Sequence, residues 1–221
     1  MQVIPAILPH GFEEILEKIT RIEGICPLIQ IDVCDGVFGR EKTWMPMGDE
    51  LLPASFAYEF DLMVADWRTY IPKCISLGVK KIVVHVDQFV DGDVDLLVAM
   101  VGDSGVALGV AVSNDTNIDF HIEIVRAIQE KYTNVYAQVM GIRKIGEQGQ
   151  FFDEEALSRI ITLKKTFGQL FIQIDGGMKP DTAKQVLNAG ADAVVVGSYI
   201  FGKDAVIAYE ELSAIEREGV C

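Results

Sequence analysis

Two aspartates stand at the ends of apolar stretches, where a buried strand would deliver a side chain to a site. Asp175 follows residues 170–174, and Asp32 follows residues 28–31. An ionised carboxylate is costly to bury unless it has a partner or a chemical task. Two carboxylates on opposite sides of a carbon acid can remove a proton next to a carbonyl and return one from the other side. For either residue taken alone, a helix cap or a loop hydrogen bond is the alternative.

Small residues follow the same strand end and the next one along the chain. Gly176 and Gly177 come directly after Asp175, and Gly197 with Ser198 follows the apolar run 193–196. Glycine lets a backbone approach a ligand closely, and N–H groups at a helix N-terminus bind phosphate. Tight turns are the alternative, but two such sequences at neighbouring strand ends favour a phosphate site.

The segments that carry these residues alternate between strands and helices. Runs rich in Val and Ile predict strands at residues 3–8, 28–33, 57–64, 81–86, 106–112, 135–140, 171–174 and 193–196. Apolar spacing and turn residues predict helices at residues 12–22, 66–77, 94–101, 118–132, 153–167, 180–189 and 205–218. The loop 36–48 is long for a connection inside a compact domain, and such loops often close sites.

Strands of this kind need helices on both faces, which places the chain in the α/β class. About eight units with no leftover segment predict a single (β/α)8 TIM barrel, one domain over residues 1–221. The carboxyl ends of all barrel strands meet at one face. Residues far apart in the sequence therefore converge there, namely Asp32, Asp61, His85, Met140, Asp175 and Gly197.

Composition excludes several classes of partner. The 221 residues carry 19 basic and 33 acidic side chains, and the net charge of −14 repels nucleic acid and anionic lipid. No apolar run approaches the roughly 18 residues that cross a bilayer. The four cysteines show no CxxC spacing, and no secretory leader precedes them, so we expect a cytoplasmic protein with reduced thiols. We expect neither a nucleic-acid nor a membrane partner.

Several motifs together resemble the ribulose-phosphate 3-epimerase family of phosphate-binding barrels. They are IDVCDGVF at residues 31–38, DLMV at 61–64, VHVD at 84–87, DGG at 175–177 and the stretch from GAD to GSYIF at 190–201. The resemblance spans almost the whole chain. It implies epimerisation of a phosphorylated ketose in carbohydrate metabolism, within the pentose phosphate pathway. It also implies Asp32 and Asp175 as the catalytic acid and base, and a homo-oligomer.

The resemblance further implies a divalent metal held by two aspartates and two histidines. Both histidine positions differ here, so the implied ligands become Gln30, Asp32, Asp61 and Asp175. A set made of oxygen ligands favours Mg²⁺ or Mn²⁺ over Zn²⁺ or Fe²⁺.

A site without a metal is the alternative. Three carboxylates in one pocket would then repel one another, and at least one would take up a proton. A cation from the loop after the sixth strand, Arg143 or Lys144, would stabilise the developing oxyanion in that case.

Further pocket residues follow from the same resemblance. It places Cys34, Met63, His85 and Met140 around the substrate and adds Gly149 to the phosphate site. Methionine at a barrel mouth is often mere packing, and His85 is equally compatible with a structural hydrogen bond.

The leading hypothesis is an epimerase of a ketose phosphate. An aldolase or decarboxylase of a sugar phosphate on the same barrel usually presents a lysine on a central strand near an aspartate, and residues 61–66 contain none. A third reading is a barrel that binds a phosphometabolite without catalysis. The missing histidines favour it, and the retention of both Asp32 and Asp175 disfavours it.

Overall fold

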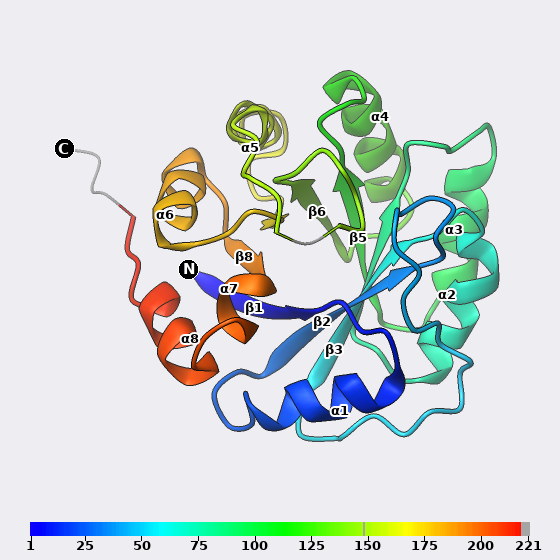
Figure 1. Cartoon of the computed structure of the whole chain (residues 1–221). Coiled ribbons are helices and arrows are strands. Elements are labelled where there is room, and N and C mark those ends of the chain that lie inside the picture. Colours follow the sequence, from blue (N-terminus) through cyan, green and yellow to red (C-terminus); the bar gives the residue numbers. More distant parts are fainter. Residues whose placement is uncertain (148, 218–221) are drawn as a thin grey trace.

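A computed structural model describes residues 1–147 and 149–217 of the chain. Its eight strands form a closed parallel barrel in sequence order, and the last strand pairs with the first (Figure 1). The strands are β1 (Gln2–Ile7), β2 (Leu28–Cys34), β3 (Ala57–Met63), β4 (Lys81–His85), β5 (Ala107–Val112), β6 (Val135–Met140), β7 (Ile172–Asp175) and β8 (Ala193–Val196). The predicted (β/α)8 fold is confirmed.

Helices surround the strands on the outside of the barrel (Figure 1). They are α1 (Phe12–Thr20), α2 (Trp67–Ser76), α3 (Asp93–Val101), α4 (Ile118–Gln129), α5 (Glu155–Phe167), α6 (Pro180–Ala189), α7 (Ser198–Phe201) and α8 (Ala205–Ser213). Residues 35–56, all of which are described, connect β2 to β3 without a helix. In the described part of the chain, no helix is long and apolar enough to span a bilayer.

The predicted elements agree with the observed ones, but several ends differ. The strands predicted at 135–140 and 193–196 and the helix at 180–189 have the observed bounds. The short helix α7 was not predicted, because four residues show no periodicity. Asp175 belongs to β7 itself rather than following it. The last predicted helix ends at Ser213, and residue 218 lies outside the described residues, so the single domain over 1–221 stays a prediction.

Each barrel strand presents alternate residues to two environments. On β2, Ile31 packs into the hydrophobic core between the barrel and its helices, whereas Gln30 and Asp32 face the interior of the barrel. On β3, Glu59 and Asp61 likewise point inward and hydrogen-bond across the barrel. This alternation has a period of two, so each inward polar residue is separated from the next by an outward apolar one.

Part of the interior is apolar. Residues from β1, β2 and β8 form a separate small cluster inside the barrel, namely Ile4, Ala6, Leu28, Ala193 and Val195. A second apolar cluster contains Val83, Ala111 and Tyr136, on the strands β4 to β6. The outer core, which contains most of the buried Val, Ile and Leu, supplies the main stabilisation by burial.

A polar cluster near the carboxyl ends of β4 and β5 holds the loop that leads into α4. Asp87 accepts hydrogen bonds from Ser113 Oγ and Thr116 Oγ1, both at 2.5 Å, and His121 Nε2 lies 3.4 Å from the same oxygen. Burial acts to raise the pKa of Asp87, but the hydrogen bonds from these three side chains outweigh it and hold that pKa well below its usual range. Asp87 therefore stabilises the loop in its ionised form.

Replacement of Asp87 should have a pH-dependent cost. Because the folded-state pKa lies below the unfolded value of about 3.9, the stabilisation is complete above the unfolded value and is lost progressively as the pH falls from there to the folded-state pKa. We expect the difference in free energy of unfolding between wild type and Asp87→Asn to shrink by about 1 kcal/mol from pH 7 to pH 3. Urea denaturation at both pH values measures it. The exposed Asp91→Asn is the control, and a difference that does not change with pH contradicts this account.

Candidate active site

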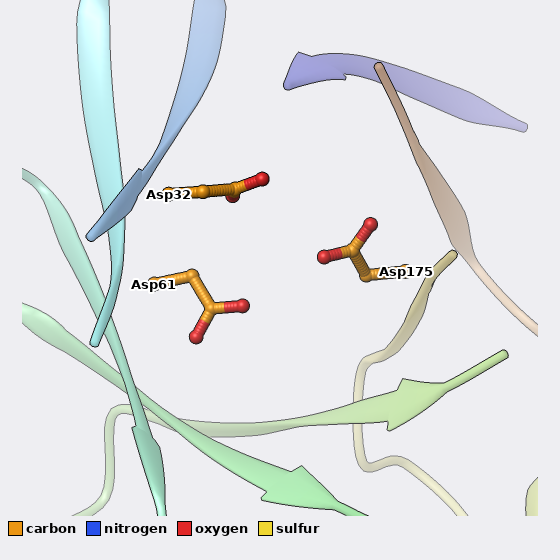
Figure 2. Close-up of side chains that lie close together, drawn as sticks. All are labelled: Asp32, Asp61 and Asp175. Carbon is orange, nitrogen blue, oxygen red and sulfur yellow. The ribbon is translucent and has the colours of Figure 1, made fainter. Parts of the chain in front are cut away.

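Three carboxylates from three strands face one another toward the carboxyl ends of the barrel strands (Figure 2). Asp32 on β2 and Asp61 on β3 are direct partners in the β2–β3 register. Asp175, the last residue of β7, points at them from the other side of the barrel interior. One oxygen of each carboxylate lies within 4.8 Å of the others. The predicted convergence is therefore observed, and the chemical roles of these residues stay predictions.

Gln30 joins two of the carboxylates through its amide nitrogen. Its Nε2 donates to Asp32 Oδ1 at 2.8 Å and to Asp175 Oδ2 at 3.1 Å. Its Oε1 is buried and has no hydrogen-bond partner among the described residues. A half-turn of the amide exchanges these two atoms with almost no change in shape. Gln30 is thus able to serve the site as a donor between two carboxylates or as an oxygen ligand.

Asp61 is fully buried, and each of its oxygens meets a different partner. His85 Nε2 lies 3.0 Å from Oδ1, and Gln138 Nε2 donates to Oδ2 at 2.8 Å. Burial acts to lower the pKa of His85, but the charge and the hydrogen bond of Asp61 outweigh burial, so that pKa is raised. His85 therefore lies against Asp61 as its hydrogen-bond partner.

The close approach of the carboxylates changes their acidity. Burial, followed by the charge of Asp61, raises the pKa of Asp32 to about 8, against the opposing hydrogen bond from Gln30. Burial, followed by the charges of Asp32 and Asp61, raises the pKa of Asp175 well above its ordinary value. Without a cation, the three groups do not all stay ionised near neutral pH.

A cavity lies beside the carboxylates. Its lining contains Asp32 and Asp175, together with the predicted pocket residues Met63 and Met140. All of the predicted phosphate-binding residues also line it, namely Gly149, Gly176, Gly177, Gly197 and Ser198. The barrel thus brings the acid–base candidates and the phosphate candidates to one cavity, where their roles stay predictions.

The turn after β7 requires glycine. Gly176 and Gly177 adopt φ angles of +104° and +71°, which other residues rarely adopt. A Cβ on Gly177 would lie 2.8 Å from the Cα of Phe152, so the turn also has no room for a side chain. The backbone beside the cavity can therefore lie close to the segment that follows the β6 loop.

Two predicted pocket residues lie outside this cavity. Cys34 is fully buried, and its Sγ lies 3.6 Å from Met63 Sδ. Burial, followed by the charge of Asp32, raises the pKa of the Cys34 thiol far above its usual range, so this thiol is a packing group rather than a nucleophile. Neither Cys34 nor His85 is among the described residues that line the cavity.

The cationic side chains of the β6 loop also lie away from the carboxylates. Arg143 pairs with Asp115 at 3.0 Å and with Asp153 at 2.6 Å on an exposed part of the surface. The described lining of the cavity includes neither Arg143 nor Lys144. This placement gives no support to the metal-free alternative in which one of them faces the oxyanion.

Four polar residues deeper in the barrel were not predicted from the sequence. They are Glu59, Lys81, Gln138 and Gln173, and they connect to one another by hydrogen bonds and an ion pair. The sequence does contain a pattern that points to two of the four. Glu59 stands two positions before Asp61, and Gln173 stands two positions before Asp175. Residues two apart on a strand face the same side.

A comparison with known proteins places this geometry in a family. The sequence pattern of the ribulose-phosphate 3 epimerase family matches residues 2–201, which include all eight strands. The chain belongs to this family. Ribulose-phosphate 3-epimerase from Aquifex aeolicus is 32% identical over 209 residues, which cover 90% of this chain and 88% of the relative. The chloroplastic ribulose-5-phosphate-3-epimerase of Arabidopsis thaliana is 28% identical over 226 residues, covering 97% and 77%.

Solved structures with lower identity share the barrel. 3-Hexulose-6-phosphate synthase from Salmonella typhimurium aligns with a TM-score of 0.66 at 14% identity, covering 97% of this chain and 98% of that one. Orotidine 5'-monophosphate decarboxylase from Sulfolobus solfataricus aligns with a TM-score of 0.65 at 17% identity, covering 96% and 95%. At these identities the likeness shows the fold alone.

Ribulose-phosphate 3-epimerases depend on a divalent metal, and the residues of this family member fit one. Three carboxylates lie within reach of a single ion, and the unpaired Oε1 of Gln30 can supply a fourth oxygen by an amide half-turn. A cation would also relieve the repulsion that raises the pKa of Asp32 and Asp175.

Loss of one carboxylate should stabilise the metal-free epimerase barrel. We expect Asp175→Asn to raise the free energy of unfolding of EDTA-treated protein by about 1 kcal/mol, because burial and the neighbouring charges raise the pKa of Asp175, and a carboxyl with a raised pKa destabilises the folded state above its unfolded pKa. Urea denaturation at pH 8 measures the change. The exposed Asp181→Asn is the control, with an expected change near zero. A clear loss of stability in Asp175→Asn would show that the carboxylates do not strain the site.

Proposed function

We propose that this chain epimerises a ketose phosphate, with ribulose 5-phosphate as the substrate that its family indicates. The observation that carries the proposal is the pair Asp32 and Asp175, which point at each other across a cavity that also contains the glycine-rich turns. Membership of the family and this pair of carboxylates favour an enzyme over a barrel that only binds a phosphometabolite.

The two carboxylates suit a proton exchange on opposite faces of one carbon. A carbon beside the ketose carbonyl that lies between them loses its proton to the ionised carboxylate. It then receives a proton from the other carboxyl, which is protonated, on the opposite face. The carbon is inverted, and one carboxyl has gained the proton that the other lost.

Gln30 and Asp61 lie close to both Asp32 and Asp175. The Nε2 of Gln30 donates to both acid–base carboxylates, and a half-turn of the amide would direct Oε1 to a cation between them instead. A divalent cation held by the three carboxylates and Gln30 Oε1 would supply positive charge beside the enediolate oxygens. Because all of these ligand atoms are oxygens, we infer that the ion is Mg²⁺ or Mn²⁺ in preference to Zn²⁺ or Fe²⁺.

The phosphate of the substrate is placed at the ends of β7 and β8. Backbone N–H groups of Gly176, Gly177, Gly197 and Ser198, with Gly149 from the β6 loop, would bind its oxygens. Chemistry that needs a lysine at this site is disfavoured, since the described lining of the cavity contains none. A homo-oligomeric state and a cytoplasmic location stay predictions.

Exchange of the C3 hydrogen tests the proposed reaction. We expect ribulose 5-phosphate in D₂O to gain deuterium at C3 when the protein and Mn²⁺ or Mg²⁺ are present, as measured by ¹H NMR. Removal of the metal with EDTA should abolish the exchange, and Mn²⁺ should restore it. Asp175→Asn and Asp32→Asn should each lower the rate by at least about 100-fold, the usual scale of acid–base catalysis.

A matched control separates loss of chemistry from loss of charge. Asp115→Asn removes a carboxylate from the same end of the barrel, where it pairs with Arg143, and should keep the wild-type rate. No exchange at C3 with any of Mn²⁺, Mg²⁺, Zn²⁺ or Fe²⁺ would falsify the epimerase assignment.

Restoring the ligands that the family pattern implies should change the metal preference. In the double variant Gln30→His and Asp61→His, two imidazole nitrogens replace an amide and a carboxylate. We expect the variant to bind Zn²⁺ at least about 10-fold more tightly relative to Mn²⁺ than wild type does, because imidazole suits zinc and carboxylate suits manganese.

Competition titrations with a chromophoric chelator measure both constants. His10→Gln, which changes an exposed histidine outside the cavity, is the control for adventitious binding. An unchanged ratio of the two constants rules out Gln30 and Asp61 as ligands.

A further inference from the structure

A line of polar side chains crosses the barrel interior and ends at Asp61. It begins at Lys81 on β4, continues through Glu59 on β3 and Gln173 on β7, and reaches Gln138 on β6. Glu59, Gln138 and Gln173 are fully buried. The mechanism proposed above uses none of these four residues, yet buried polar groups are costly unless each finds a partner.

The Lys81–Glu59 ion pair gives Gln173 a single amide orientation. Lys81 Nζ contacts Glu59 Oε2 and donates to Gln173 Oε1 at 2.7 Å. The Nε2 of Gln173 donates to Glu59 Oε1. An ammonium group only donates and a carboxylate only accepts, so a reversed amide would lose both bonds and place like atoms in contact.

The amide orientation of Gln173 in turn determines the amide orientation of Gln138. The Nε2 of Gln173 also donates to Gln138 Oε1 at 2.6 Å, which leaves the Nε2 of Gln138 to donate to Asp61 Oδ2 at 2.8 Å. A reversed Gln138 would place its carbonyl oxygen against the Asp61 carboxylate and its NH₂ against the NH₂ of Gln173. Both contacts are repulsive, so the donor that faces Asp61 is determined by the ion pair.

We propose that Lys81, Glu59, Gln173 and Gln138 form a positioning relay that fixes the rotation of the Asp61 carboxylate. Gln138 holds Oδ2 while His85 holds Oδ1, and two bonds to different oxygens define the carboxylate plane. One oxygen of this carboxylate lies within 4.8 Å of an oxygen of Asp32 and of Asp175. The use of this fixed carboxylate as a metal ligand rests on the proposed function, whereas the relay itself does not.

Direct Mn²⁺ binding tests the relay without any activity measurement. Electron paramagnetic resonance titration of free Mn²⁺ gives the Kd of wild type and of each variant. We expect Gln138→Met, which removes the donor to Asp61, to weaken Mn²⁺ binding about 10- to 100-fold, the range seen for residues that support metal ligands. Lys81→Met and Gln173→Glu, which remove the orienting contacts, should weaken it in the same direction by a smaller factor.

Lys164→Met is the matched control for Lys81→Met. Lys164 also forms an ion pair with a carboxylate, Asp192 at 2.6 Å, and also donates to an oxygen, Leu170 O at 2.9 Å, but it lies on the outer helix α5 and not in the barrel interior. The Kd of the Lys164→Met variant for Mn²⁺ should equal that of wild type. Gln173→Glu keeps the side-chain volume, so it tests the relay even where Lys81→Met fails to fold. Wild-type Kd values in both Gln138→Met and Gln173→Glu overturn the proposal.

A second measurement separates the relay from the metal site. In ¹⁵N-glutamine-labelled, metal-free protein, the side-chain NH₂ resonances of Gln138 should shift in Lys81→Met and Gln173→Glu, and stay unchanged in Lys164→Met. If wild type binds no Mn²⁺, the metal part of the proposed function fails, and these spectra still decide the relay. Unchanged Gln138 resonances in Gln173→Glu overturn it.

Discussion

Repulsion among Asp32, Asp61 and Asp175 is the constraint on which the rest of the site depends. Three carboxylates within 4.8 Å of one another are unfavourable in a buried place unless protons, donors or a cation offset their charge. The closed barrel holds them there because the β2–β3 register pairs Asp32 with Asp61, while β7 brings Asp175 from the other side. The same repulsion that destabilises the metal-free protein makes the site receptive to a divalent ion.

Polar residues in the barrel interior offset this repulsion, because they donate hydrogen bonds to the three carboxylates. Gln30 donates between two of the carboxylates, and Gln138 donates to the third. A half-satisfied buried network costs more than an apolar interior, so the amide of Gln138 must keep one orientation. The Lys81–Glu59 ion pair provides a fixed end from which that orientation follows. The outer core, packed from apolar residues alone, supplies the stability that lets the interior serve the site.

The sequence predicted the barrel and the convergence at its mouth, because a parallel barrel repeats one pattern eight times and brings every strand end to one face. It did not predict Gln138 as a partner of Asp61, since a glutamine inside a strand has no signature of its own. The partner depends on the register of strands that are far apart in sequence. For Arg143, the sequence suggested a place in the site that the structure does not show. Its loop position suggested a cation at the site, but Asp115 and Asp153 draw the side chain to the surface.

Asp61 adds a negative charge to the carboxylate cluster, and a partner for that charge lies beside it. His85 contacts Asp61 at 3.0 Å, and its raised pKa favours the imidazolium form. A carboxylate paired with an imidazolium is together neutral. A lone additional carboxylate would oppose the negative charge that develops on an enediolate. The Asp61–His85 pair therefore places an additional carboxylate oxygen near Asp32 and Asp175 with less net negative charge than a lone Asp61 would bring.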